Sequence, residues 1–224
     1  RLRFKKKINV VFFASSLSMW RYQHLYEAMS KHPRFNVWIV IAPSKPYSDT
    51  QRKKDVETLK EFFNSKNIPF LIGWDGGNTF LDVKKYLKPD ILFYPQPYRD
   101  FYPDVIGYNA FYDRLLCYYP YAFWRSTGKF SYDMPLHRFA WKLFYSTNLH
   151  KKDAEQYALN HGRNVEVVGY PTADDFLSGK YVDIWKIQNK KKKRVIWAPH
   201  YSIFAGGPLK QSNFIWMADF MLDI

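Results

Sequence analysis

The side chain best placed for chemistry is His200, which follows an apolar run through Pro199. The run Val-Ile-Trp-Ala predicts a buried strand over residues 194–198. In an open α/β sheet, ligand-binding groups stand at the carboxyl ends of the strands. An imidazole there can deprotonate an acceptor hydroxyl, or bind a phosphate as an imidazolium. We therefore predict His200 as a catalytic candidate, with a purely structural histidine as the alternative.

The loop after the first predicted strand offers a second set of binding groups. Ser15 and Ser16 are small enough to let a ligand approach the backbone, and the helix predicted over residues 18–31 can direct its amino end at an anion. Trp20 and Arg21 fall on the first turn of that helix, beside the same cleft. The competing interpretation is a capped helix start with a surface ring and a solvated cation.

Two proline-containing aromatic loops complete the candidate site. Gln96 and Tyr98 lie in the sequence Tyr-Pro-Gln-Pro-Tyr, directly after a strand predicted over residues 91–94. Tyr119 and Tyr121 repeat this arrangement at the end of the next predicted strand. Amide and hydroxyl groups among aromatic rings suit the recognition of a polyol. We predict a hydroxyl-rich aromatic cleft at one edge of the sheet, and rings that only pack on one another are the alternative.

Signatures of several other function classes are missing. The sequence has no P-loop, no Gly-x-Gly-x-x-Gly fingerprint, no Cys-x-x-Cys pair and no His-Glu-x-x-His motif. We expect no metal site and no cofactor. The single cysteine, Cys117, lies in an apolar run and is predicted to be a buried thiol, which favours a reducing, cytoplasmic setting. His150 is predicted to be exposed at a helix start.

The chain is strongly basic: 34 Lys and Arg against 20 Asp and Glu give a formal net charge of +14. Such an excess favours phosphorylated substrates, an anionic membrane surface or nucleic acid, and a solvated basic surface is the alternative. The basic runs 5–7 and 190–194 lack the wide face with interleaved aromatics that nucleic acid needs, so nucleic acid is disfavoured. No apolar stretch approaches the roughly 20 residues that span a bilayer, and no signal peptide is visible. We predict a cytoplasmic protein, with peripheral contact to the cytoplasmic face of the membrane as an option.

Short apolar runs that alternate with amphipathic stretches indicate parallel βα units. Strands are predicted over residues 8–13, 35–41, 69–72, 91–94, 115–119, 145–147 and 165–168. Helices are predicted over residues 18–31, 49–66, 79–87, 136–144, 150–160 and 213–222. The predicted fold class is α/β, with a Rossmann-like parallel sheet flanked by helices and the beginning of a second α/β domain.

The order of these elements sets the predicted domain boundaries. Residues 1–171 form the Rossmann-like amino-terminal domain, and residues 172–193, with little apolar periodicity and a lysine run, form a linker. Residues 194–224 start a nucleotide-donor domain. Because the chain starts at Arg1 and stops soon after this start, we expect a fragment of a longer protein that is inactive by itself.

Three short motifs carry a family resemblance. They are Lys-Pro-Asp-Ile-Leu-Phe-Tyr at 88–94, Val-Gly-Tyr-Pro at 168–171 followed by Asp174 and Asp175, and Arg-Val-Ile-Trp-Ala-Pro-His at 194–200. As a set they resemble the CDP-glycerol glycerophosphotransferase-like proteins, which are GT-B-fold enzymes of teichoic-acid and capsular polysaccharide assembly. The resemblance covers nearly the whole chain.

The resemblance implies an acceptor-side amino-terminal domain, followed by a nucleotide-binding domain that holds most of the donor. It implies a CDP-glycerol or nucleotide-sugar donor, a lipid-linked polymer acceptor and no metal bound by protein carboxylates. Ala-Pro-His at 198–200 matches the Ala-Pro-Thr-like element of the family. Tyr-Pro-Tyr-Ala at 119–122 stands where better-known members carry a Trp-His-Gly-Thr-like element with the proposed base, and it contains no histidine.

Two other functions stay open. Many GT-B proteins share the Val-Gly-Tyr-Pro stretch, including UDP-sugar 2-epimerases, so an epimerase or another GT-B glycosyltransferase is the first alternative. The second alternative is a non-catalytic module that binds an anionic polymer or a membrane surface through its charge.

Overall fold

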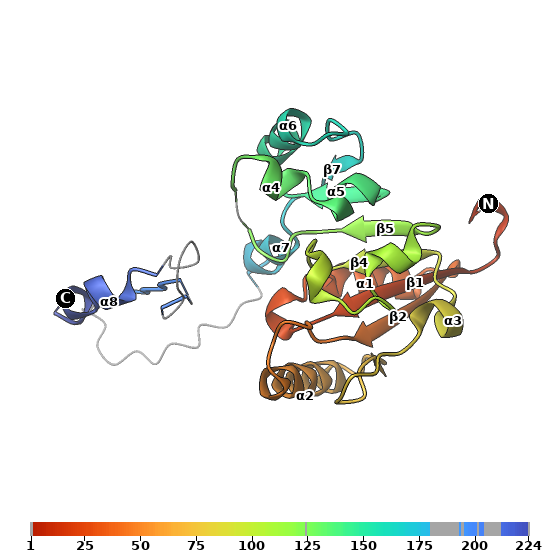
Figure 1. Ribbon diagram of the computed structural model, residues 1–224, viewed down its shortest axis with the longest axis horizontal. Helices are drawn as coiled ribbons and strands as arrows, with labels where there is room; N and C mark the ends of the chain where they lie inside the picture. Colours follow the sequence, from red (N-terminus) through yellow and green to blue (C-terminus); the bar gives the residue numbers. More distant parts are fainter. Residues whose placement is uncertain are drawn as a thin grey trace. The chain divides into compact units, whose positions relative to one another are not determined.

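The computed structural model describes residues 2–123, 125–179, 193, 195–200, 202–203 and 212–223. The chain divides into two compact units, Arg1–Tyr181 and Val182–Ile224. The first unit is the α/β body in which the sheet of Figure 1 lies.

A seven-stranded sheet forms the centre of the first unit, and all of its strand pairs are parallel. The strands are β1 (Ile8–Ala14), β2 (Phe35–Ile41), β3 (Leu71–Ile72), β4 (Ile91–Tyr94), β5 (Leu115–Tyr118), β6 (Lys142–Tyr145) and β7 (Val165–Val167). Their spatial order is β3-β2-β1-β4-β5-β6-β7. β2 and β3 therefore follow one another outward on one side of β1, and β4 to β7 follow one another outward on its other side. This order confirms the predicted α/β fold class with a Rossmann-like parallel sheet.

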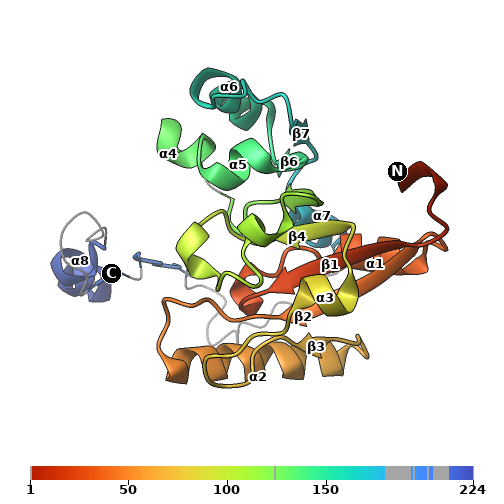
Figure 2. The same cartoon turned by 45° about the vertical axis from the view of Figure 1, so that its right-hand side comes forward.

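Helices cover both faces of the sheet. The α-helices of the first unit are α1 (Gln23–Lys31), α2 (Asp49–Ser65), α3 (Val83–Leu87), α4 (Lys129–Tyr132), α5 (Pro135–Phe139), α6 (Asn148–Tyr157) and α7 (Pro171–Leu177). The described residues also contain short 3₁₀ helices: η1 (Leu2–Phe4), η2 (Leu17–Met19), η3 (Arg99–Phe101) and η4 (Tyr108–Phe111). One core layer packs α1 and α2 against the sheet, and the other packs α3 to α6 on the opposite face. Figure 1 and Figure 2 both show α4, α5 and α6 gathered at the β7 end of the sheet.

The central strand β1 contributes to both core layers. Val11 and Phe13 belong to the layer under α3 to α6, whereas Val10 and Phe12 belong to the layer under α1 and α2. All four side chains are fully buried. This is the pattern expected of a middle strand in a parallel sheet with helices on both faces, and it explains why the strand reads as a continuous apolar run.

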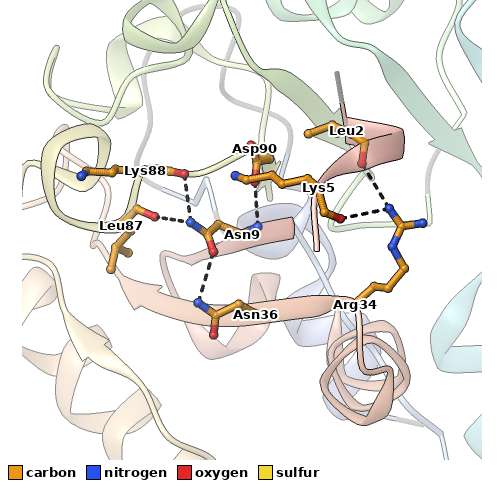
Figure 3. Close-up of polar contacts among 8 residues, drawn as sticks. All are labelled: Leu2, Lys5, Asn9, Arg34, Asn36, Leu87, Lys88 and Asp90. Carbon is orange, nitrogen blue, oxygen red and sulfur yellow. Dashed lines mark hydrogen bonds and ion pairs between the residues drawn. The ribbon is translucent and has the colours of Figure 1, made fainter. Parts of the chain in front are cut away.

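At the amino ends of the strands, Asn9 of β1 holds the segment before β4 in place (Figure 3). Its side-chain amide donates to the carbonyl oxygens of Leu87 and Lys88 at 3.0 and 3.2 Å. Its backbone N–H donates to Asp90 Oδ2 at 2.8 Å, and Lys5 forms an ion pair with the same carboxylate. These bonds fix the β1–β4 junction from its amino end.

The helix after β1 begins later than predicted. Residues 17–19 form η2, and α1 begins only at Gln23. Trp20 and Tyr22 lie in the segment between η2 and α1, and the rings of both are buried in the core. Residues two apart on a continuous helix do not face the same side, so an extended segment is needed to bury both rings.

The segment before α6 also differs from prediction. β6 takes residues that were divided between a helix predicted over 136–144 and a strand predicted over 145–147. Leu143 and Tyr145 are buried and alternate with partly exposed neighbours, as in a strand with one side chain in two facing the core. The aromatic residues around them fit a helix as well as a strand, so the hydrophobic periodicity of this segment does not distinguish the two.

The second unit contains α8 (Phe214–Leu222), which confirms the predicted last helix. The backbone N–H of its first residue donates to Ser212 Oγ at 3.2 Å. The described residues 195–200 form no strand, and Val195 is 60% exposed. The strand predicted over 194–198 is therefore absent from its described part. A strand needs a hydrogen-bonded neighbour, and no other described segment of this unit supplies one.

The predicted linker overlaps a helix. α7 begins at Pro171, and the division between the two compact units falls after Tyr181. The assignment of residues 194–224 to a donor domain stays a prediction. In the parts of the chain that the structure describes, no helix combines the length and apolarity needed to cross a membrane.

Candidate substrate-binding site

Polar side chains from three strand ends meet at the carboxyl end of the β1–β4 junction. Ser15 directly follows β1, Ser44 lies in the loop after β2, and Gln96 follows β4 through Pro95. All three are buried, with Gln96 fully excluded from solvent. Gln96 Nε2 donates to Ser44 Oγ at 2.8 Å, and the Tyr102 hydroxyl donates to the backbone oxygen of Gln96 at 3.4 Å. The direction of strand addition reverses here, and open α/β sheets bind ligands at such a point.

Two polar atoms of this cluster, Ser15 Oγ and Gln96 Oε1, are buried and have no hydrogen-bond partner within the described residues. Burial raises the pKa of Tyr102 strongly, although its hydrogen bond with the backbone of Gln96 lowers it in part. The phenol of Tyr102 is therefore protonated and neutral at physiological pH.

Tyr22 fastens the loops after β4 and β5 to each other. Its buried hydroxyl donates to the backbone oxygen of Tyr94 at 2.7 Å and accepts from the backbone N–H of Tyr119 at 3.1 Å. Burial raises the pKa of Tyr22 well above its usual value, so this bridge persists over the whole physiological pH range. The two aromatic loops thus keep a fixed separation.

A second polar group joins the ends of β5, β6 and β7. The Tyr119 hydroxyl donates to the backbone oxygen of Gly169 at 3.1 Å and lies 2.9 Å from Ser146 Oγ. Because Tyr119 gives its proton to Gly169, Ser146 is the donor in the second bond. Burial raises the pKa of Tyr119 to about 12, so its phenol stays protonated.

Arg21 stands at the rim of an apolar pocket of about 560 Å³ beside this second group. The residues that line the pocket include Phe93 of β4 and Cys117 of β5, which belong to the core layer under α1 and α2. Burial alone would raise the pKa of Tyr170, but hydrogen bonding to Arg21 and Thr172 outweighs it and lowers that pKa. Arg21 Nε is buried without a partner in the described residues. The guanidinium is thus a partly paired cation able to meet an anionic group.

His150 is buried rather than exposed, contrary to the prediction. Its Nδ1 lies 2.8 Å from Thr147 Oγ1, and its ring stacks on Tyr145 at 5.7 Å between centroids. The ring of Phe123 approaches it edge-on at 6.4 Å. His150 therefore faces inward from the first turn of α6 and packs on the last residue of β6, Tyr145.

Trp20 packs in the core, and Ser16 forms a hydrogen bond within its own loop. The Trp20 ring lies 5.1 Å from that of Phe63, and its Nε1 donates to Gln23 Oε1 at 3.0 Å. Trp20 is therefore a core residue of the layer under α1 and α2. Ser16 is buried and shares a 3.1 Å hydrogen bond with Ser18 within the loop.

Tyr98 and Tyr121 are half-buried in the two aromatic loops. Burial raises the pKa of the intervening Tyr118 well above its usual value, and other phenols, Tyr98 and Tyr121 among them, add to the rise. The ring of Tyr98 packs on Phe101 at 5.0 Å.

His200 belongs to the second unit. Its Nδ1 accepts from the backbone N–H of Ser202 at 3.3 Å and lies 2.7 Å from Ser202 Oγ. Its catalytic role stays a prediction.

Three polar side chains of the first unit join the site without a sequence prediction: Ser44, Tyr102 and Ser146. Ser44 had a usable signal, because it follows the strand predicted over 35–41 much as Ser15 follows β1. Tyr102 and Ser146 had none, since their places depend on how η3 and β6 pack. Among the described residues, no three His, Cys, Asp or Glu side chains are grouped to hold a metal ion.

No family model matches the chain, and no curated protein matches it. Among solved structures, the fold is similar to that of a UDP-N-acetylglucosamine 2-epimerase, with a TM-score of 0.53 and 17% sequence identity. The match covers 82% of this chain and 53% of the epimerase chain, so the present chain spans about half the length of that structure. At this identity the likeness shows the fold, an α/β Rossmann-like arrangement of the GT-B kind, and nothing about the substrate.

Proposed function

We propose that this chain is the acceptor-side part of a GT-B-type enzyme that acts on a nucleotide-activated substrate during the assembly of a cell-surface polymer. The observation that carries the proposal is that two polar groups, Ser15 with Gln96 and Tyr119 beside Arg21, both lie at carboxyl ends of the strands of one doubly wound sheet. Ligands of open α/β sheets bind at this edge. The GT-B-like fold supports an enzyme of this superfamily.

The reaction we propose is the transfer of glycerol phosphate, or of a sugar, from a CDP-linked or other nucleotide donor to a lipid-linked polymer precursor. The sequence resemblance to CDP-glycerol glycerophosphotransferase-like proteins is the support for the glycerol phosphate version. In that version an acceptor hydroxyl oxygen bonds to the donor phosphorus, the bond to the CMP oxygen breaks, and the hydroxyl proton passes to a base. His200 is the proposed base. The cationic side chain of Arg21 is suited to hold a phosphate of the acceptor.

A UDP-sugar 2-epimerase-like activity is the second candidate. It is favoured by the fold of the solved epimerase, and by the Val-Gly-Tyr-Pro stretch at 168–171. Peripheral contact with the anionic cytoplasmic face of the membrane is part of the proposal in both versions, and its support is the net charge of +14.

A thermal-shift screen of the full-length protein that contains this chain tests the proposed class. The ligands are CDP-glycerol, CDP, UDP-N-acetylglucosamine, a single-stranded oligonucleotide and vesicles of anionic lipid. A ligand at about a hundred times its Kd stabilises the folded state by about 2.7 kcal/mol. A shift with CDP compounds supports transfer, and a shift with the UDP-sugar alone supports the epimerase version. Stabilisation by the oligonucleotide or the vesicles without any nucleotide effect would instead identify a non-catalytic binding module.

A further inference from the structure

We infer that four buried residues, Ser15, Ser44, Gln96 and Tyr102, form a subsite for the hydroxyl groups of a neutral polyol, such as a glycerol unit or a sugar ring. We call this group the switch-point cradle. The inference deepens the proposed function, because it makes this polyol the acceptor end of the substrate. The observation behind it is Gln96 Oε1, which is buried without a hydrogen-bond donor in the described residues.

The cradle has hydrogen-bonding capacity to spare. Gln96 Nε2 donates a hydrogen bond to Ser44 Oγ at 2.8 Å, whereas Gln96 Oε1 accepts none within the described residues. Ser44 accepts that bond and keeps its own hydroxyl proton to give. A buried amide oxygen without a donor destabilises the folded state, and folded proteins leave few such groups unpaired. Gln96 is fully excluded from solvent, so its unpaired Oε1 is best explained by a bound group that donates a hydrogen bond to it.

The chemistry of the four side chains selects a neutral ligand. Two hydroxyls, one amide and one phenol carry no charge, and burial keeps the phenol of Tyr102 protonated. A phosphate or an ammonium group in this place would be a buried charge without a counter-ion, which is far costlier than a buried hydroxyl. A hydroxyl group can donate to Gln96 Oε1 and accept from Ser15 or Ser44 at the same time.

The segments that carry Ser44 and Tyr102 are joined to each other. The backbone N–H of Lys45 donates to the backbone oxygen of Phe101 at 2.9 Å. The ring of Tyr47 meets the ring of Phe101 edge-on at 6.1 Å. Lys45 directly follows Ser44, and Phe101 directly precedes Tyr102, so these contacts hold the loop after β2 against η3 next to the cradle.

The test measures polyol binding by the first unit's own residues and needs no nucleotide. Saturation-transfer NMR is recorded with glycerol and with glucose on the wild-type chain, on Gln96→Leu and on Tyr102→Phe. Gln156→Leu is the matched control, because Gln156 is exposed on α6. Inorganic phosphate is titrated separately, with ³¹P line width as the readout.

We expect the polyols to bind the wild-type chain and the control alike, and to bind both cradle variants about tenfold more weakly. Gln96→Leu is expected to melt close to the wild type: leucine has a similar volume, and the loss of the bond from Nε2 to Ser44 Oγ is offset by the loss of the unpaired buried Oε1. Tyr102→Phe keeps the ring in the core, so a folded variant is available even if Gln96→Leu fails to fold.

Three results would overturn the inference. The first is that the wild type binds no polyol, which would leave an ordered water as the occupant. The second is that Tyr102→Phe binds polyols as tightly as the wild type does. The third is that the wild type binds phosphate in place of polyols. These results bear on the cradle alone. A failure of the nucleotide screen with polyol binding intact would instead reject the proposed function and leave the subsite standing.

Discussion

Tyr22 and Tyr119 are joined by a buried hydrogen bond of 3.1 Å, although they are 97 positions apart in the sequence. The Tyr22 hydroxyl accepts from the backbone of Tyr119 and donates to the backbone oxygen of Tyr94 at 2.7 Å. One phenol on the segment before α1 therefore sets the distance between the ends of β4 and β5. Both aromatic loops of the candidate site start from those strand ends.

We predict that Tyr22→Phe lowers the free energy of unfolding by about 2–3 kcal/mol, because it leaves two buried backbone groups without a partner. Urea unfolding of the variant gives this value directly. Tyr86→Phe is the control, since Tyr86 is 64% exposed and its substitution is expected to change stability by less than about 0.5 kcal/mol. Equal stabilities for the Tyr22 variant and the wild type would show that the bridge does not hold the loops.

The buried imidazole of His137 predicts a loss of stability in mild acid. Burial lowers the pKa of His137 to about 4, from the value of 6.5 in an unfolded chain, and nearby Asp133 offsets this only in part. Between about pH 6.5 and 4, His137 binds a proton in the unfolded chain but stays neutral in the folded protein. The free energy of unfolding therefore falls as the pH is lowered through this window, by up to about 1.4 kcal/mol per pH unit.

Urea unfolding of the wild type and of His137→Gln across this pH range isolates the histidine contribution. Glutamine can still accept the 3.2 Å hydrogen bond that the backbone N–H of Met134 gives to the imidazole. We expect a flatter pH dependence for the variant between about pH 6.5 and 5. Parallel curves for the two proteins would mean that His137 does not titrate in this way.

Cys117 is predicted to be inert in the folded protein. Burial raises the pKa of its thiol to about 12, and the side chain is almost wholly excluded from solvent. Its reaction with a disulfide reagent at neutral pH is expected to be about a hundredfold slower, or more, than in denaturant, because the thiolate is the reactive species. Rapid labelling without loss of structure would show that the pocket beside Arg21 opens to solvent.

The role proposed for His200 predicts a large kinetic effect in the full-length protein. His200→Ala is expected to lower the turnover rate by about 10²–10⁴, the usual contribution of a general base. His161→Ala is the control, since His161 is exposed on the surface of the first unit. A variant of His200 that keeps its rate would move the base elsewhere, and His150 would become the next residue to substitute.

The parts of the fold that could be predicted are those in which the pattern of apolar residues along the sequence matches the pattern of burial. β1 is apolar at nearly every position because both of its faces are covered, and α2 has its cap at Ser48 together with buried Val56, Leu59 and Phe63. β6 could not be predicted, because its residues Lys-Leu-Phe-Tyr suit a helix as well as a strand. Only its pairing with β5 and β7 decides between the two.

The sequence predicted only those residues of the candidate site that directly follow a predicted strand. Ser15 and Gln96 were found because each follows an apolar run, and Tyr119 for the same reason. Their partners were not, since the bond from Gln96 to Ser44 joins residues 52 positions apart. Trp20 shows the opposite failure: the turn that buries its ring depends on the packing of Phe63, which its local sequence does not reveal.

The most direct test of the central claim is ³¹P NMR of the full-length protein with CDP-glycerol and, separately, with UDP-N-acetylglucosamine. The account predicts that a nucleotide-activated substrate is consumed, with CMP appearing in the presence of a lipid-linked acceptor for the transferase, or with the UDP-sugar converted to its epimer. His200→Ala should slow whichever reaction is seen. Unchanged spectra of both compounds, with acceptor present and the protein folded, would contradict the account.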